Sequence, residues 1–413
     1  MIETKKSVLS NGLRLILHRD TSTPLVAVNV LYNIGSKHED PEHTGLAHLF
    51  EHLMFSGSRN ASDFDTPIQN AGGENNAFTN SDMTNYYSIV PADNLETLLW
   101  LESDRMTDLI ITEESLEVQK NIVVEEFNET CLNEPYGDLW HHLSDLTFKQ
   151  HHYKWPTIGK TPKHISNTTL ADVMAFYKNN YNPSNAILSI AGNIDYDDTL
   201  RKVDKWFGAL QGMNRTEKKI PKEEQQTQLK ELKFHSNVPN TALYYSFHTV
   251  GRNHPDYFAT DLVSDILSHG KSSRLYKNLY RQNKYFHSID AYVTGTLDPG
   301  LLIIDSKLKS NELLKEAKAS IWEQIDQLNN DGFTENELQK VKNKTLSTMA
   351  FSEMSIISKA LNLCYYEHCG DFNLINKQEE LYDNVRVEDI RRLAAEVLKR
   401  ENCSILSYGP FKN

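Results

Sequence analysis

Apolar residues recur at both strand-like and helix-like spacings along the chain, which predicts a mixed α and β protein. An Asn-Gly pair at 11–12 separates two short apolar runs, and Asn-Gly is a preferred turn of β-hairpins. Residues 26–32 are almost continuously apolar, as expected of a strand that is buried on both faces. Residues 45–55 then carry apolar side chains at helical spacing, with Thr44 as the candidate N-terminal cap.

The segment that follows predicts short strands and then helices. A Gly-Gly turn at 72–73 leads into one strand, and residues 86–90 form another. A helix is expected over 91–106 and a second over 112–127. The first turn of this second helix holds two glutamates, where the helix dipole favours negative charge.

The two halves of the chain resemble each other in this pattern. A helix that begins near Asp172 leads into the apolar run 185–192, and a helix that begins near Asp389 leads into the run 402–409. Asp172 and Asp389 are 217 residues apart, about half of the 413-residue chain. A helix followed by a buried strand also recurs in unrelated α/β proteins, but the matched spacing favours a duplicated α+β domain.

A polar segment at 212–228, rich in Lys, Glu and Gln, separates the two halves and is interpreted as a linker. We therefore predict an N-terminal domain at 1–211 and a related C-terminal domain at 229–413. The candidate chemistry lies in the first domain, and no metal site is expected in the second.

Composition excludes several classes of protein. The chain has 43 Lys and Arg against 56 Asp and Glu, a formal charge of −13, which argues against nucleic acid or an anionic membrane as the main partner. No apolar run approaches the ~18 residues of a membrane span. Four scattered cysteines fit a reducing compartment. Because no signal-peptide core is seen, we expect a cytoplasmic protein, or a periplasmic one if the sequence has been trimmed.

The candidate chemistry centres on the helix at 45–55, which carries His48, Glu51 and His52. Positions i and i+4 of a helix are neighbours, so the two imidazoles can bind one ion, and zinc suits them. Glu51 lies on the same side, where it can take a proton from a water molecule and pass it to a leaving amine. The alternative is two surface histidines beside a solvated glutamate, but the helix is otherwise apolar.

This His-x-x-Glu-His order is the reverse of the commoner zinc-peptidase motif. With its companion motifs, the sequence resembles the pitrilysin, insulinase and mitochondrial processing peptidase family over most of the chain. The resemblance implies two homologous α/β-sandwich domains, each a mostly antiparallel sheet covered by helices, that form half of a clamshell. It also implies one zinc ion per chain and peptide-bond hydrolysis in a chamber between two chains. The companion motifs lie at 10–13, 44–48, 73–79, 102–106 and 123–126.

The resemblance places the third zinc ligand at Glu126, 74 residues after His52. Helical spacing puts Glu126 on one face with Ile122, Val123 and Gln119, whereas Glu125 points away. A solvated glutamate cluster is the alternative. Many relatives have a second glutamate where this chain has Gln119, and an amide there can still donate a hydrogen bond to the ligand.

The stretch Asn76, Ala77 and Phe78 matches the strand on which the family binds extended peptides by β-augmentation. An ordinary short strand after a glycine turn is the alternative.

Active members of the family also use an arginine and a tyrosine from the C-terminal half. The matching positions here are Tyr280 and His287, so neither residue type is kept, unless the alignment slips onto Arg281 and Tyr285. Some members are two-chain enzymes in which the partner supplies this pair. The resemblance therefore favours a zinc-bearing subunit that works with a homologous partner chain, as a heterodimer or a homodimer.

Two other functions compete with a zinc peptidase. A non-catalytic scaffold subunit is disfavoured because His48, Glu51, His52 and Glu126 are all present. A serine or cysteine hydrolase is disfavoured because no glycine-flanked serine elbow and no cysteine with a nearby histidine stands out.

Overall fold

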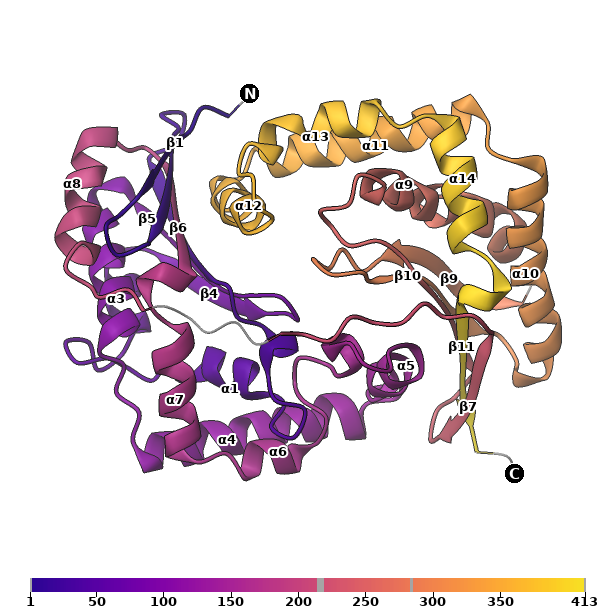
Figure 1. Ribbon diagram of the computed structural model, residues 1–413, viewed down its shortest axis with the longest axis horizontal. Coiled ribbons are helices and arrows are strands. Elements are labelled where there is room, and N and C mark those ends of the chain that lie inside the picture. The colour runs from indigo at the N-terminus through magenta and orange to yellow at the C-terminus, as the bar shows by residue number, and fades with distance from the viewer. Residues whose placement is uncertain (1, 214–218, 283–284, 412–413) are drawn as a thin grey trace. The chain divides into compact units, whose positions relative to one another are not determined.

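The computed structural model describes residues 2–213, 219–282 and 285–411, and the chain divides into two compact units (Figure 1). The first unit comprises Met1–Asn128, Trp155–Ile220 and Met349–Lys377. The second comprises Glu129–Lys154, Pro221–Thr348 and Gln378–Asn413. Each unit thus takes one segment from the other half of the sequence, which differs from the contiguous division at 1–211 and 229–413 that the repeat suggests.

The first unit is built on a six-stranded sheet in the order β1-β2-β6-β3-β5-β4. β2 and β6 are parallel, and the other neighbouring pairs are antiparallel. β3 is buried along almost its whole length, as its apolar run predicts. β4 pairs only with β5, so it forms an edge of the sheet. The strands are β1 (Lys5–Val8), β2 (Arg14–Arg19), β3 (Leu25–Tyr32), β4 (Glu74–Thr79), β5 (Thr84–Pro91) and β6 (Ala186–Gly192).

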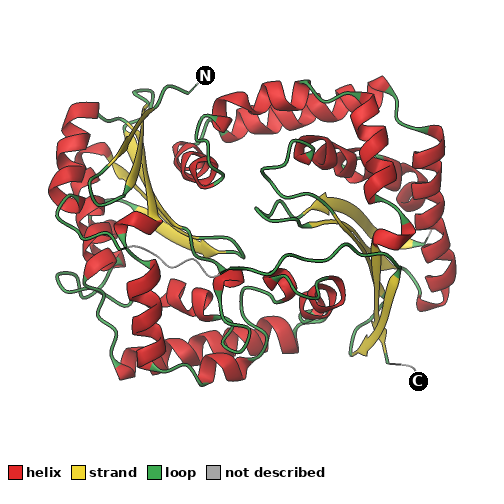
Figure 2. Cartoon of the chain, in the orientation of Figure 1, coloured by secondary structure: helices red, strands yellow, loops and turns green. Residues whose placement is uncertain are grey.

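One large apolar core joins one face of this sheet to its helices (Figure 2). The opposite face is covered by α12 (Ile356–His368), which packs on β3 and β6 although it lies far along the chain. The other helices of the unit are α1 (Leu46–Leu53), α2 (Asp65–Asn70), α3 (Leu95–Thr107), α4 (Glu113–Phe127), α6 (Pro162–Ser166), α7 (Leu170–Asn180) and α8 (Tyr196–Phe207).

The second unit has a five-stranded sheet in the order β7-β11-β8-β10-β9, in which only β7 and β11 are parallel. α5 (Leu139–Thr147) packs on β11, and α9 (Tyr257–Ser268) packs on β9. The strands are β7 (Lys230–Ser236), β8 (Ala242–His248), β9 (Phe286–Val293), β10 (Leu301–Leu308) and β11 (Cys403–Pro410). The remaining helices are α10 (Leu314–Asp331), α11 (Glu335–Ser352), α13 (Leu374–Asp383) and α14 (Val387–Val397).

The two sheets share one connectivity, because β2, β6, β3, β5 and β4 occupy the places that β7, β11, β8, β10 and β9 occupy in the second sheet. The helix before the parallel strand also matches: α7 leads to β6, and α14 leads to β11. The α+β class and the tandem of related folds are therefore confirmed. The exchanged segments match too, since α5 covers the second sheet as α12 covers the first.

The expected linker at 212–228 is only partly free of structure. Residues 214–218 lie outside the described residues. Glu223 accepts the backbone N–H groups of Lys149, Gln150 and His151, and the buried Gln226 donates to the carbonyl of Cys403. The C-terminal part of this segment therefore belongs to the second unit.

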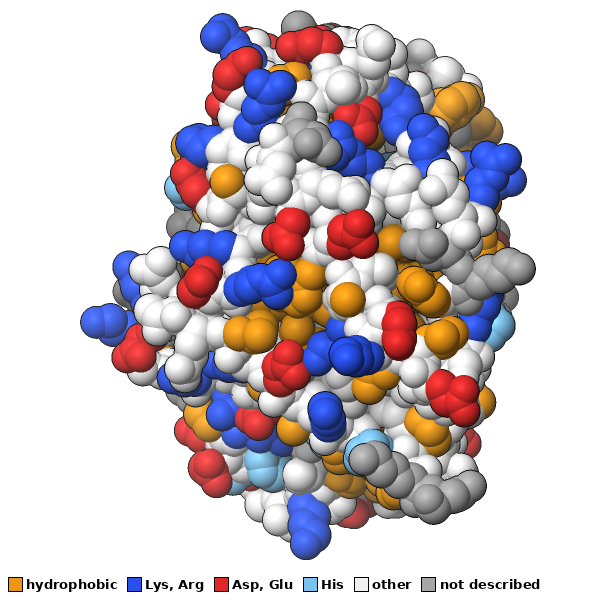
Figure 3. Space-filling view, turned by 90° about the vertical axis from the view of Figure 1, so that its right-hand side faces the viewer, with side chains coloured by type: hydrophobic (Ala, Val, Ile, Leu, Met, Phe, Trp, Pro, Cys, Tyr) orange, Lys and Arg blue, Asp and Glu red, His pale blue; other side chains and the backbone are white. Residues whose placement is uncertain are grey.

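Three general features follow from the described residues. None of their helices combines the length and the apolar character needed to cross a membrane. The cysteines Cys131, Cys364, Cys369 and Cys403 are all buried and free of disulfides. On the face shown in Figure 3, Lys and Arg side chains are intermixed with Asp and Glu, so neither charge forms a continuous field there.

Candidate metal centre

α1, the helix that carries the motif, is held at its N-terminus by a carboxylate from an earlier loop. Glu39 Oε2 accepts the N–H of Gly45 at 2.9 Å, and Glu39 Oε1 accepts the N–H of Ala47 at 2.8 Å. The sequence prediction that Thr44 caps this helix is wrong. The Thr44 hydroxyl instead contacts His164 Nδ1 and accepts the N–H of Lys160, so it ties the preceding loop to α6.

Packing fixes the same helix from two sides. Phe50 of α1 is fully buried, and its ring lies 4.3 Å from that of Tyr181 and 5.7 Å from that of Tyr177 on α7. Gly45 adopts φ +91, and a Cβ there would lie 2.5 Å from the side chain of Ile165. Only glycine fits this backbone conformation and this space.

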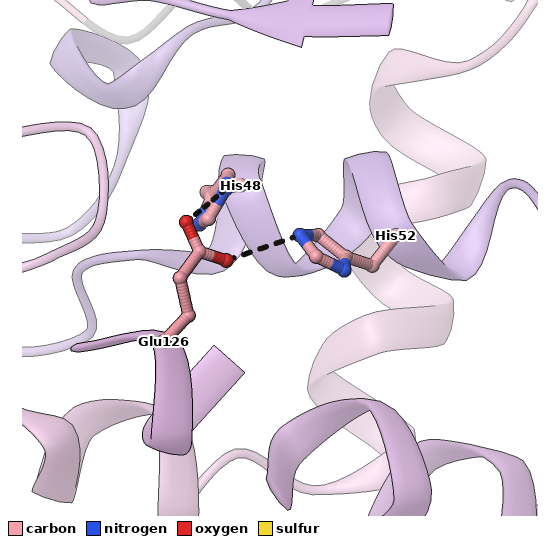
Figure 4. Close-up of side chains that lie close together, drawn as sticks. All are labelled: His48, His52 and Glu126. Carbon is pink, nitrogen blue, oxygen red and sulfur yellow. Dashed lines mark ion pairs between the residues drawn. The ribbon is translucent and has the colours of Figure 1, made fainter. Parts of the chain in front are cut away.

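The three expected ligands converge in the structure (Figure 4). His48 Nε2 lies 3.7 Å from Glu126 Oε1, and His52 Nε2 lies 3.6 Å from Glu126 Oε2. One ligand atom from each of the three residues lies within 4.8 Å of the others, and no other such group of three His, Cys, Asp or Glu side chains occurs among the described residues. The imidazole rings are nearly perpendicular, with centroids 4.9 Å apart.

Glu126 projects toward α1 from the last turn of α4, which is capped at its start by Thr112 and Ser115. The Glu126 side chain is 38% exposed and the residue as a whole is half-buried, whereas the neighbouring Glu125 is exposed to solvent. The stripe around Glu126 is less apolar than the spacing suggests, because Val123 is buried but Ile122 is 45% exposed. The distances to the histidines therefore single out Glu126 better than its surroundings do.

Burial keeps both histidines in the neutral form that a metal requires. It lowers the pKa of His48 to about 4, with a smaller contribution from His52, and it lowers the pKa of His52 as well. Burial also raises the pKa of Glu126. The two distances from the histidine nitrogens to the Glu126 oxygens exceed ordinary hydrogen-bonding range, so the three side chains approach one another without being hydrogen-bonded to each other there.

Glu51 lies one residue before His52 and is coupled to the same centre. Burial raises the pKa of its carboxyl group, the charge of Glu126 raises it further, and a hydrogen bond from Thr79 opposes the rise. Thr79 ends β4, so the edge strand and the candidate base are joined by a side chain. A carboxylate of raised pKa is the chemistry that a general base needs.

A buried ion pair lies in the core of the same unit. Arg105 is bonded by both Nε and an Nη to the Glu102 carboxylate, and both side chains are 1% exposed. The Arg105 guanidinium also lies 3.9 Å from the ring centroid of Phe64 and 4.4 Å from that of Tyr86. Glu102 and Arg105 lie in the 102–106 motif, and their buried contacts show that these two residues of the motif stabilise the core of the unit.

The other site residues expected in the first unit lie on the edge strand β4 and on helix α4. Asn76, Ala77 and Phe78 lie on edge strand β4, which packs against α1, and Phe78 is 37% exposed. The Asn76 side chain accepts the N–H of Ala77 at 2.7 Å. Gln119 is half-buried on α4, and no hydrogen bond joins it to Glu126 among the described residues. An outer partner at Gln119 therefore stays a prediction.

Tyr280 and His287 belong to the second unit. Tyr280 is 39% exposed on a π-helical turn, and its ring stacks on that of Tyr276 at 4.9 Å. His287 is exposed on β9. Their relation to the ligand cluster stays a prediction.

Glu39 is the residue that sequence reasoning missed. An acidic residue before a helix is a familiar capping signal, but Glu39 is six residues before Gly45. A turn closed by the His43 N–H and the Asp40 carbonyl at 2.8 Å lies between them, and Glu39 reaches back to Gly45. Burial raises its pKa to about 8, against hydrogen bonds from backbone N–H groups at the start of α1 and from the Trp155 side chain, which lower it.

Comparisons with known proteins agree with this geometry. Residues 14–161 match the family model described as insulinase (peptidase family M16), and residues 167–345 match the model described as the peptidase M16 inactive domain. The zinc protease YmxG of Bacillus subtilis is 28% identical over 86% of each chain, and the zinc protease PqqE of Helicobacter pylori is 27% identical over 95% of this chain and 89% of its own.

A yeast relative, the β subunit of the mitochondrial processing peptidase, is 24% identical over 76% of this chain and 73% of its own. The crystal structure of a protease from Helicobacter pylori superposes with a TM-score of 0.92 at 25% identity, over 99% of this chain and all of that one. The relatives support a peptidase function and imply zinc. The chain belongs to the insulinase family of peptidases, M16.

Proposed function

We propose that this chain is a zinc-dependent endopeptidase or oligopeptidase. The observation that carries the proposal is the convergence of His48, His52 and Glu126 on one point, with Glu51 beside it. Two imidazoles and a carboxylate are a common donor set of catalytic zinc sites, which keep a further position open.

The donor set fits zinc because both histidines are neutral and one ligand atom from each of the three residues lies within 4.8 Å of the others. A zinc ion held there would polarise a peptide carbonyl and lower the pKa of a water molecule. The Glu51 carboxylate accepts a proton from the attacking water and then donates it to the amine nitrogen of the leaving peptide. The raised pKa of Glu51 suits a group that must do both.

β4 is the proposed peptide-binding strand. It is paired on one side only, and the Ala77 N–H is satisfied by its neighbour Asn76 instead of by β5. Successive residues of a strand direct their N–H groups to opposite sides, so Ala77 faces the open edge. An extended peptide added there would exchange the local hydrogen bond for a main-chain one.

The finer points of the proposal concern assembly and location. We propose that peptides are enclosed in a clamshell-like chamber between two chains, and that a homologous partner or a second copy supplies the arginine and tyrosine that Tyr280 and His287 replace. The yeast relative is by name one subunit of a peptidase. We propose a cytoplasmic location because none of the four cysteines is in a disulfide.

Metal analysis tests the function directly. The purified chain should contain about one zinc per molecule, and chelation should abolish peptide cleavage. If the isolated chain binds zinc but cleaves poorly, a partner-dependent catalytic subunit is supported. If it binds no zinc, a non-catalytic scaffold subunit becomes the better description.

A further inference from the structure

α1 lacks a cap of its own. The first N–H groups of a helix have no partner within it, and they usually bond to the side chain of the residue just before it. That residue here is Gly45, which has no side chain. Glu39 accepts two of these N–H groups, those of Gly45 and Ala47, so one side chain anchors the start of the ligand helix.

The Glu39 carboxyl group is held in an unusual place. It is 4% exposed, and no lysine or arginine pairs with it in the described part of the chain. Burying a carboxyl group this deeply is unfavourable unless hydrogen bonds compensate for the lost contact with water. N–H groups at the N-terminus of α1 stabilise the buried Glu39 carboxyl group, and Glu39 in turn provides acceptors for these N–H groups.

The ligand that depends most on this turn is His48, the residue after Ala47. Metal-binding histidines normally donate their second nitrogen to an acceptor, which fixes the ring. His48 Nδ1 is buried and has no hydrogen-bond partner among the described residues. The ring direction of His48 therefore depends on where the backbone of the first turn lies.

We infer that Glu39 is a positioning residue for the metal centre, acting through the first turn of α1 on His48. The inference rests on the proposed function, since it concerns the affinity of that site for zinc. A merely structural cap would change stability alone, whereas a positioning residue changes zinc affinity in the folded protein.

The chain offers a matched control at α8. Asp195 also accepts two backbone N–H groups at a helix start, from Asp197 at 3.1 Å and Asp198 at 3.0 Å, but it is exposed and its helix carries no ligand. Glu39→Gln and Asp195→Asn both replace a carboxylate by an amide of the same shape, and they differ in which helix they affect.

The experiment measures zinc affinity by competition with a chromogenic chelator for the full chain and both variants. We expect Glu39→Gln to weaken zinc binding by about 10-fold or more, and Asp195→Asn to leave it unchanged. Amide hydrogen exchange in the metal-free protein adds a second readout, and residues 47–50 should exchange faster only in Glu39→Gln.

Equal zinc affinity of wild type and a folded Glu39→Gln variant would overturn the inference while leaving the proposed function intact. Absence of zinc binding by the wild type would overturn the proposed function instead, and unchanged exchange at 47–50 would then overturn the role of Glu39 in holding the turn. If Glu39→Gln does not fold, Glu39→Asp is measured in its place, since it keeps the charge and withdraws the carboxylate by one methylene.

Discussion

The two units place different chemistry on corresponding helices. α1 follows β3 in the first unit, and α9 follows β8 in the second. Asp261 and Asp265 of α9 and His269, the residue directly after this helix, follow one another at intervals of four residues. The Tyr382 hydroxyl donates to Asp261 at 2.6 Å, the Thr345 hydroxyl donates to Asp265 at 3.0 Å, and His269 Nδ1 lies 3.1 Å from the other Asp265 oxygen.

The difference shows what marks a metal centre in this fold. On α9, hydroxyl groups from α11 and α13 satisfy the carboxylates, so the polar stripe is complete without a cation. At α1, the Nε2 atoms of His48 and His52 lie 3.7 and 3.6 Å from the two carboxylate oxygens of Glu126 on α4, so ligand atoms from two helices converge on one point. Polar residues at helical spacing on one helix are therefore insufficient, and the convergence with a ligand from a second helix is the distinguishing feature.

The largest expected effect is the loss of zinc in His52→Ala. Removal of one of three protein ligands should reduce the zinc content from about one per chain to near zero and abolish peptide cleavage. Mass spectrometric metal analysis of the dialysed protein measures it. His269→Ala, directly after α9, is the matched control, and loss of zinc in that variant would contradict the contrast between the two helices.

Glu51→Gln should retain zinc and lose turnover by about 10²- to 10⁴-fold, because an amide cannot take the proton of the attacking water. Single-turnover cleavage of a fluorogenic peptide, normalised to bound zinc, gives the ratio. Asp265→Asn is the control in the second unit and should leave turnover unchanged. Cleavage by Glu51→Gln at the wild-type rate would exclude Glu51 as the base.

His48 in the first unit and Asp261 in the second should contribute to the pH dependence of stability with opposite sign. The pKa of His48 is about 4 in the folded chain against an ordinary 6.5, so the unfolded state takes up its proton first. The stability that this group contributes to the metal-free first unit is present above pH 6.5 and falls by up to about 3 kcal/mol as the pH drops toward 4. Native-state hydrogen exchange of β3, corrected for intrinsic rates, measures this loss.

Burial raises the pKa of Asp261 in the second unit to about 6 from an ordinary 3.8. Its contribution is therefore full below pH 3.8 and is lost as the pH rises through 6. Asp261→Asn should remove this dependence and stabilise β8 more at pH 8 than at pH 4. A larger gain for that variant in acid would show that the sign is wrong.

The smallest expected effect concerns the edge strand. Ala77→Pro removes an N–H that β5 does not use, so the sheet should tolerate it. Peptide docking would lose one main-chain hydrogen bond, which should raise KM by about tenfold with a smaller change in kcat. Ala77→Gly keeps the N–H and serves as the control. An unchanged KM in Ala77→Pro would remove β4 from substrate binding.

Much of the fold could be predicted because its elements are local. The α1 and α4 helices, the buried β3 strand and the repeat of helix and strand near Asp172 and Asp389 all follow from spacing within one segment. The ligands His48 and His52 could be predicted for the same reason. Glu126 needed the family resemblance, since several glutamates share its helix.

What could not be predicted depends on contacts between distant segments. The apolar residues of α12 predict a helix that packs on a sheet, but their spacing does not identify which sheet. Its place in the first unit is therefore known only from the structure. The Glu39 cap depends on a loop conformation that brings it back to Gly45. The hydroxyl groups that complete α9 come from Thr345 and Tyr382, on helices whose packing no local spacing reveals.

The exchange of α5 and α12 between the units delays completion of the first unit during biosynthesis. The last strand of the first sheet ends at Gly192, but the helix that covers its second face begins at Ile356. At about 5–20 residues per second, a ribosome needs about 10 to 30 s to make the intervening chain. During that interval the nascent sheet presents Ala27, Leu31 and Ile187 uncovered, so a chaperone or the ribosome surface has a defined apolar patch to shield.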